Sequence, residues 1–151
     1  MNLNIHVRPA TERDVPQILA LVQELALYEK APDEVENTVA RMKEDGFGEN
    51  RIFKAFVAEV DGTVVGTAIT YFRYSTWKGK CLFLEDLVVT ETMREKGVGK
   101  ALFNQCMAFG KETHCKRMNW QVLDWNSPAI EFYKKYNADL DEEWINGTVV
   151  L

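Results

Sequence analysis

Residues 87–100 read LVVTETMREKGVGK, and this stretch decides the fold. It begins with a buried strand, Leu87-Val88-Val89, and continues into a helix that is entered through two glycines. The spacing from Arg94 to Gly97 and Gly99 fits the pattern R-x-x-G-x-G. Glycines let a backbone approach a ligand closely, and the first turn of a helix carries N–H groups with no intrahelical acceptor. We therefore expect a site for a pyrophosphate group here.

Two better-known phosphate-binding loops do not fit this stretch. A Walker-type loop places a glycine five residues before its Gly-Lys step and a Ser or Thr after it, but this chain has Arg94 and Ala101 there. A dinucleotide-binding fingerprint needs a glycine at the position of Leu102, at the start of a βαβ unit. From the six-residue pattern alone one alternative stays open, in which the two glycines only loosen a loop in front of an amphipathic helix.

Composition and charge restrict the class of protein. The chain has 151 residues, of which 46% are hydrophobic, and this size predicts one domain over residues 1–151. The first residues lack a basic region followed by an apolar stretch, and no apolar run reaches membrane-spanning length, so we expect a cytoplasmic protein without a membrane partner. The net charge of −5 argues against nucleic acid as a partner and is compatible with a cationic substrate.

The cysteines and histidines do not indicate a cross-linked or metal-binding protein. Cys81, Cys106 and Cys115 are odd in number, lie far apart and form no C-x-x-C pair. His6 and His114 are the two histidines of the chain. We therefore expect three reduced thiols, no disulfide and no metal.

Turn and cap signals divide the chain into strands and helices. Thr11 and Asp14 form a variant of the capping box that starts a helix. Asp61 and Gly62 form a strong hairpin signal between two β-rich runs. We expect strands at residues 5–8, 52–60, 63–74, 81–89, 117–123 and 148–151, and helices at residues 11–28, 33–45, 97–113 and 126–136.

The order of these elements mixes hairpins with one strand–helix–strand crossover, from residue 81 to residue 123. It predicts an α/β (α+β) fold with a central mixed, mostly antiparallel sheet and helices on both faces. The crossover places the glycine pair directly after the carboxyl end of a strand, where open α/β sheets bind ligands. The position of the motif thus agrees with a ligand site.

The glycine loop resembles the acetyl-CoA loop of the GCN5-related N-acetyltransferases (GNAT), whose pattern Q/R-x-x-G-x-G/A is matched by Arg94, Gly97 and Gly99. A second element of that family, an Asn followed seven residues later by a Tyr, is matched by Asn126 and Tyr133. The resemblance implies a single GNAT domain that binds acetyl-CoA. The cofactor contacts that it implies are Leu87, Val88, Val89, Arg94, Glu95, Lys96, Gly97, Val98, Gly99, Lys100, Asn126 and Tyr133.

Further stretches resemble the spermidine/spermine (diamine) acetyltransferases. They are residues 24–30, 45–48, 74–79, 84–86 and 123–126, and the similarity extends from Ile5 to about Trp144. Polyamine-acetylating members tend to have an Asp where this chain has Ser75, which favours the thialysine acetyltransferase branch. The resemblance implies a small primary amine as acceptor, namely thialysine or a lysine-like amino acid, or a diamine or polyamine. It also implies a homodimer.

Acetyl transfer to an amine requires the neutral amine, yet an alkylammonium has a pKa near 10.4, about three units above neutral, so deprotonation costs about 4–5 kcal/mol. The resemblance implies that Glu85 binds the ammonium and passes its proton to water, and that a main-chain N–H near Leu87 holds the carbonyl oxyanion. Glu85 and Asp86 point to opposite faces of a strand unless a bulge intervenes. The structural alternative is that these carboxylates lie at a solvent-exposed strand end or pair with a basic neighbour.

Tyr133 is the residue that the resemblance implies as proton donor to the departing CoA thiolate. The alternative for Tyr133 is core packing, because it belongs to an apolar stripe at helical spacing. Asn126 is expected to cap the same helix. Asn137 replaces the family's usual glycine after that helix, and Asn adopts a left-handed helix cap almost as readily as glycine.

The acceptor-binding residues that the resemblance implies are Tyr28, Glu29, Trp77, Glu85 and Asp86. Glu29 begins an acidic loop that either attracts the positive charge of an acceptor or is a solvated surface. Trp77 either walls the acceptor site or meets a partner subunit.

The leading functional hypothesis is therefore an acetyl-CoA-dependent N-acetyltransferase for a small primary amine. Two other classes stay open. One is a non-catalytic acyl-CoA-binding regulator that keeps the cofactor site. The other is a protein-lysine acetyltransferase, which needs an open acceptor groove.

Overall fold

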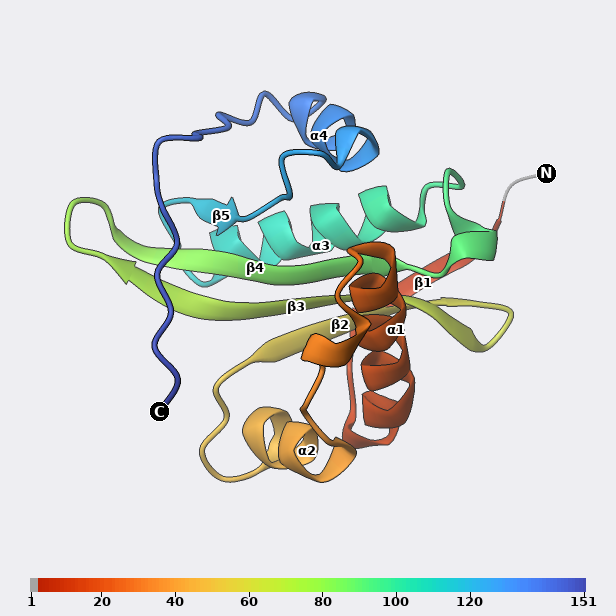
Figure 1. Ribbon diagram of the computed structural model, residues 1–151. Helices are drawn as coiled ribbons and strands as arrows, with labels where there is room; N and C mark the ends of the chain where they lie inside the picture. Colours follow the sequence, from red (N-terminus) through yellow and green to blue (C-terminus); the bar gives the residue numbers. More distant parts are fainter. Residues whose placement is uncertain (1–2) are drawn as a thin grey trace. The chain divides into compact units, whose positions relative to one another are not determined.

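Five strands form one sheet within residues 3–121 of the computed structural model, which describes residues 3–151 (Figure 1). Their spatial order follows the sequence: β1 Ile5–Pro9, β2 Lys54–Val60, β3 Thr63–Ser75, β4 Gly79–Val89 and β5 Met118–Trp120. Strands β1 to β4 pair antiparallel, and β5 pairs parallel to β4. The predicted mixed, mostly antiparallel sheet is therefore confirmed.

The chain divides into two compact units between Gln121 and Val122. The first unit holds the sheet together with α1 Val15–Tyr28, α2 Val39–Phe47 and α3 Val98–Glu112. Short 3-10 turns, η1 Glu12–Asp14, η2 Pro32–Glu34 and η3 Glu91–Met93, connect these elements. The second unit holds α4 Ser127–Lys134. The expectation of one domain over the whole chain stays a prediction.

The alternation of side chains along β2 builds a core on each face of the sheet. Ala55 and Val57 belong to a cluster with residues of α1 and α2, among them Ile18. Phe56, which lies between them, points the other way and meets Phe109 of α3 with ring centroids 5.5 Å apart. Helices α1 and α2 thus cover one face and α3 covers the other, as Figure 1 shows and as the sequence predicted.

The hairpin signal is confirmed in detail. Asp61 and Gly62 both have left-handed backbone angles, with φ of 51° and 76°. Two consecutive left-handed residues match the twist of the flanking strands in a two-residue turn. Asn137 likewise has a φ of 57°, so it takes the left-handed conformation expected of it after the fourth helix.

Two of the predicted elements are wrong. The second helix begins at Val39 and not at residue 33, because Thr38 caps it by accepting a hydrogen bond from the Arg41 N–H at 3.2 Å, while residues 32–34 form one 3-10 turn. Residues 148–151 form no strand, since no neighbouring strand pairs with them in the described part of the chain. The strand expected over residues 117–123 is shorter, Met118–Trp120.

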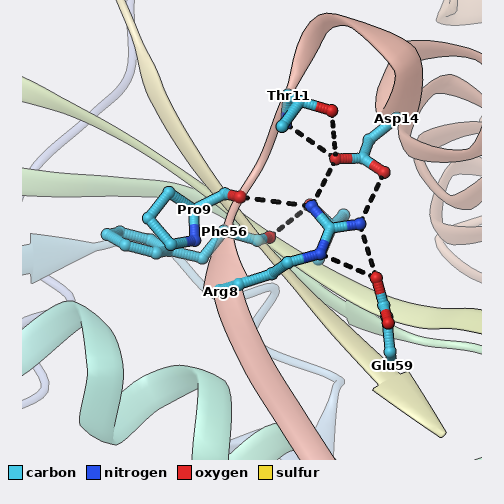
Figure 2. Close-up of polar contacts among 7 residues, drawn as sticks. Arg8, Pro9, Thr11, Asp14, Phe56 and Glu59 are labelled. Atoms are coloured by element: carbon cyan, nitrogen blue, oxygen red, sulfur yellow. Dashed lines mark hydrogen bonds and ion pairs between the residues drawn. The ribbon is translucent and has the colours of Figure 1, made fainter. Parts of the chain in front are cut away.

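One buried carboxylate joins the first strand to the first helix (Figure 2). Asp14 accepts two hydrogen bonds from the Arg8 guanidinium, at 2.7 and 2.9 Å, and one from the Thr11 N–H at 2.7 Å. The last of these is the capping contact that the sequence predicted. Arg8 also donates from Nε to Glu59 of β2, at 2.7 Å. The network therefore fixes the entry of α1 against β1 and β2.

Among the described residues, no helix has the length and apolar character needed to traverse a lipid bilayer. Cys81 and Cys106 are buried free thiols, and Cys115 is a partly buried one. Burial raises the pKa of Cys106 to about 12, so this thiol is kept in its unreactive protonated form.

We predict that Asp14→Asn destabilises the protein in a pH-dependent way. The hydrogen bonds from Arg8 hold the pKa of Asp14 below its ordinary value. The stabilisation is therefore complete above the unfolded-state pKa of about 3.9 and is lost as the pH falls through the lower folded-state pKa. Urea unfolding should show a loss of about 2–4 kcal/mol at pH 7 that shrinks in acid.

The matched control is Asp33→Asn, which changes an exposed carboxylate of η2. It should change the free energy of unfolding by less than about 0.5 kcal/mol at either pH. An equal loss for both variants would contradict the role of the Asp14 network.

Candidate functional site

The edge of β4 is only partly paired. β5 pairs with Leu82–Leu84 of β4, and within the first unit no strand pairs with residues 85–89 on that side. In this segment every second residue directs its N–H and C=O toward the open side. The Val89 carbonyl accepts a hydrogen bond from Arg94 Nε at 3.1 Å. The open edge therefore offers main-chain donors and acceptors directly before the glycine loop.

The glycine loop enters α3 through two left-handed residues. Glu95 has a φ of 61°, and Gly97, which caps the helix, has a φ of 89°. The first N–H that bonds within the helix is that of Ala101, which donates to the Gly97 carbonyl at 3.0 Å. The N–H groups of Val98, Gly99 and Lys100 consequently have no intrahelical acceptor. They lie at the N-terminal end of a 15-residue helix, where free N–H groups and the helix dipole favour an anion. That a pyrophosphate binds there stays a prediction.

The two glycines of the loop have different reasons to be glycine. Gly97 needs its left-handed angle, which side chains rarely adopt. Gly99 has a helical backbone, and a Cβ added there would meet Val89 Cγ2 at 3.7 Å, an ordinary contact. The folded chain itself therefore has room for a side chain at 99. The absence of one leaves the main chain open to a ligand.

Arg94, the first residue of the motif, is held by α1. Its guanidinium lies over the Tyr28 ring at 5.0 Å from the centroid, and Nη2 is 3.9 Å from Glu24 Oε1. Together with the bond to Val89, these contacts direct the side chain toward α1 and β4. The contacts of Arg94 therefore tie the loop to α1 and β4.

A bulge in β4 separates the two adjacent carboxylates. Asp86 pairs with Ile69 and Leu84 pairs with Thr70, so Glu85 is an extra residue in β4. At such a bulge, the side chains of Glu85 and Asp86 need not point to opposite faces of the sheet. Glu85 is exposed and accepts a hydrogen bond from the Tyr71 hydroxyl at 2.9 Å.

The charges of Glu85 and Glu29 act on Asp86 at this bulge. Burial, with the negative charges of Glu85 and Glu29, raises the pKa of Asp86 to about 6. Burial also raises the pKa of Glu29. Within residues 3–151, none of the three forms an ion pair with a basic side chain. The alternative that they pair with a basic neighbour is therefore wrong, and the arrangement suits an external cation.

The bond from Tyr71 keeps Glu85 in one orientation. Burial, together with the hydrogen bond to Glu85, raises the pKa of Tyr71 to about 12, so its hydroxyl stays a donor at neutral pH. The Tyr71 ring lies against Phe83 with centroids 5.3 Å apart. Tyr71 was not among the residues predicted from the sequence, and only the pairing of β3 with β4 reveals it.

Asn126 and Tyr133 belong to the second unit and are described within it. Asn126 caps α4, and its side chain accepts a hydrogen bond from the Ala129 N–H at 3.4 Å, as expected. Tyr133 is 8% exposed, and its ring meets that of Phe132 edge-on with centroids 5.4 Å apart. The packing role that the sequence offered for Tyr133 is therefore present.

Trp77 is not brought together with the carboxylates. It is 88% exposed in the turn between β3 and β4. From Gly79 to Glu85 the strand extends roughly 20 Å at about 3.3 Å per residue. In one chain, therefore, Trp77 does not wall a site built on Glu85, whereas Tyr28 and Glu29 do lie at the end of α1 beside Arg94 and the carboxylates.

The described residues contain no group of three or more His, Cys, Asp or Glu side chains that could hold a metal ion. The Glu29, Glu85 and Asp86 carboxylates thus form a charged site without metal-binding geometry. Of the remaining predicted residues, Val88 is buried. Leu87 and Val89 are half-buried, and Lys96 and Lys100 are exposed.

Comparison with known proteins gives a consistent result. The model of the Acetyltransferase (GNAT) family matches residues 18–138. Thialysine N-epsilon-acetyltransferase of Bos taurus is 37% identical over 147 residues, which cover 91% of this chain and 86% of that protein. Spermidine/spermine N(1)-acetyltransferase-like protein 1 of Homo sapiens is 37% identical over 145 residues, covering 91% of this chain and 21% of that protein.

A solved structure shares the fold. Aminoglycoside N-acetyltransferase AAC(6')-Iy in complex with CoA superposes with a TM-score of 0.79 at 20% identity, covering 99% of this chain and 97% of that one. At this identity the likeness concerns the fold alone.

We predict that the Asp86 carboxyl titrates near pH 6 and that each neighbouring carboxylate contributes to this value. Carbon-detected NMR should show the midpoint fall in Glu85→Gln and in Glu29→Gln, because each variant removes one repelling charge. Since a raised folded-state pKa disfavours the ionised form, Asp86 should lower stability as the pH rises from its ordinary value to about 6. A midpoint near 4 in the unaltered protein would contradict the cluster.

Proposed function

The chain belongs to the GNAT acetyltransferase family and is an N-acetyltransferase, and we propose that it moves the acetyl group of acetyl-CoA to the primary amine of a small cationic acceptor by direct attack in a ternary complex. The acceptor is thialysine or a lysine-like amino acid, or a diamine or polyamine. One observation carries the proposal: three carboxylates without a basic partner lie beside an open strand edge that leads into an anion-binding helix end.

The residues of the loop fit the pyrophosphate of acetyl-CoA. The N–H groups of Val98, Gly99 and Lys100 are directed away from the helix, and Gly99 leaves space that a Cβ would fill. In the proposal these groups hold the phosphates, with Glu95, Lys96 and Gly97 shaping the loop. The open edge of β4 at Leu87 and Val89 would hold the rest of the carrier through main-chain hydrogen bonds. Acetyl-CoA supplies the activated acetyl thioester.

The carboxylates bind and deprotonate the acceptor in this proposal. Asp86 and Glu29, whose pKa values are raised, gain most from a cation because it relieves their burial and repulsion. Glu85 is exposed and held by Tyr71, so it can take the ammonium proton and pass it to water. A main-chain N–H near Leu87 would then hold the oxyanion.

Two residues complete the proposal from the family resemblance. Tyr133 would donate its hydroxyl proton to the departing thiolate, and Asn126 would keep its helix-capping role while contacting the carrier. Trp77 lies too far from Glu85 in one chain, so its contribution to the acceptor site would come from the second subunit of a homodimer.

The test of the function is a panel of amines offered with acetyl-CoA, with the product identified by mass spectrometry. Thialysine, lysine, putrescine and spermidine are the candidates, and alanine is the control because it has only an α-amine. We expect acetylation of side-chain or terminal primary amines and none of alanine. Asp86→Asn should raise KM for the acceptor about tenfold and leave KM for acetyl-CoA unchanged. Glu112→Gln, on the exposed end of α3, is the matched control.

The outcomes of this panel separate the three hypotheses. Coenzyme A binding without turnover of any amine would favour a regulator. A lysine-containing peptide is offered beside these amines, and its acetylation without acetylation of any free amine would favour a protein-lysine acetyltransferase. Either result would overturn the proposed small-amine activity.

We predict that Tyr133→Phe lowers kcat about a hundredfold while the Kd for CoA changes less than about twofold, because only the proton donor is lost. Tyr136→Phe, on the same chain segment, serves as control and should leave kcat unchanged. Calorimetry and steady-state kinetics measure the two quantities. An unchanged kcat in Tyr133→Phe would limit this residue to packing.

A further inference from the structure

Glu24 is a carboxylate of α1 that makes most of its contacts outside its own helix. Its oxygens accept hydrogen bonds from the Thr90 hydroxyl, at 3.0 and 3.2 Å. Oε1 also accepts from the Glu91 N–H at 2.8 Å and lies 3.9 Å from Arg94 Nη2. Three residues of the segment between β4 and α3 therefore meet one side chain.

These contacts act on the start of the glycine loop. Thr90 follows the last residue of β4, and Glu91 begins η3, whose first N–H groups lack partners within the turn. Glu24 satisfies one of them and so fixes the direction in which the chain leaves β4. Arg94 is the last residue before the left-handed Glu95, which turns the chain toward the anion-binding amides.

Tyr28 adds to this arrangement from the same face of α1. It lies four residues after Glu24, one helical turn away, and its ring supports the Arg94 guanidinium at 5.0 Å. Glu24 and Tyr28 thus hold Arg94 from two successive turns of α1. Arg94 in turn bonds the Val89 carbonyl at 3.1 Å, which links α1, β4 and the loop.

The negative charge of Glu24 has an unfavourable effect on an anionic ligand of the loop. A negative charge beside a segment that binds an anion disfavours that anion, although Arg94 offsets part of the Glu24 charge. The hydrogen bonds of Glu24 to the loop favour ligand binding, because a loop already held in its binding conformation loses less conformational entropy when the ligand binds.

We propose that Glu24 is a positioning residue for the acetyl-CoA loop, which it holds through Thr90, Glu91 and Arg94 in the conformation that presents the α3 amides. This inference rests on the proposed function, because it assumes that the loop binds the carrier. Glu24 touches no reacting atom, and its effect reaches the carrier through the loop.

The test compares Glu24→Gln with Glu91→Gln by calorimetric titration of CoA. Both variants remove one negative charge from the same region, but the Glu91 side chain is exposed and its main-chain N–H, which bonds Glu24, is kept. We expect Glu24→Gln to raise the Kd for CoA on the order of tenfold and Glu91→Gln to leave it unchanged or lower it. KM for acetyl-CoA should rise in Glu24→Gln with little change in KM for the amine.

A second variant keeps the inference testable if Glu24→Gln folds poorly. Thr90→Val keeps the shape of the side chain and removes the hydroxyl that donates to Glu24. It should raise the Kd for CoA in the same direction, and the double variant should show less than the sum of the two effects, because both variants weaken the same contact between residues 24 and 90.

Two results overturn the inference in different ways. If the unaltered protein binds CoA and neither Glu24→Gln nor Thr90→Val weakens that binding, Glu24 does not position the loop. If the unaltered protein binds no CoA, the proposed function fails and this inference fails with it.

Discussion

The short pairing between β4 and β5 is the constraint on which the rest of the site depends. β5 covers only Leu82–Leu84, although β4 continues for five more residues. A buried strand edge must find partners for its N–H and C=O groups. Residues 85–89 have none from a strand of the first unit on that side, so the edge is suited to a ligand that carries amide-like groups of its own. The glycine loop begins where this open segment ends.

The fold places three carboxylates close together next to this edge. Ionised Asp86 is unfavourable in the free protein, because burial separates it from water and the charges of Glu85 and Glu29 repel it. A bound ammonium would remove much of that cost. The same bulge that adds Glu85 to β4 brings its side chain to the Tyr71 hydroxyl, so the cluster is oriented as well as charged. The unfavourable charge repulsion is therefore located where a bound cation would reduce it.

The sequence predicted correctly a turn and a helix entry that depend on a few neighbouring residues. The turn at Asp61-Gly62 and the helix entry at Gly97 depend on backbone angles that a few residues set, and both are confirmed. The GNAT resemblance is confirmed as well. The sequence pattern places the start of α2 too early, at residue 33, because the apolar spacing continues on the N-terminal side of the Thr38 cap. The bulge at Glu85 depends on the register between β3 and β4, and so does the distance from Glu85 to Trp77. The residue pattern of a single sequence does not determine this register.

Helix α1 connects the Arg8–Asp14 network with the glycine loop. A guanidinium–carboxylate contact holds it at each end, Arg8 with Asp14 at its entry and Arg94 with Glu24 near its last turn. The first contact is the more buried one and fixes the helix against β1 and β2, whereas the side chains of the second, which lies beside the loop, are about one third exposed. Because both ends of the helix are held, Glu29, which follows its last residue, lies close enough to Asp86 to influence its pKa. Helix α1 therefore contacts the glycine loop through Glu24 and Tyr28 and places Glu29 near the carboxylates of β4.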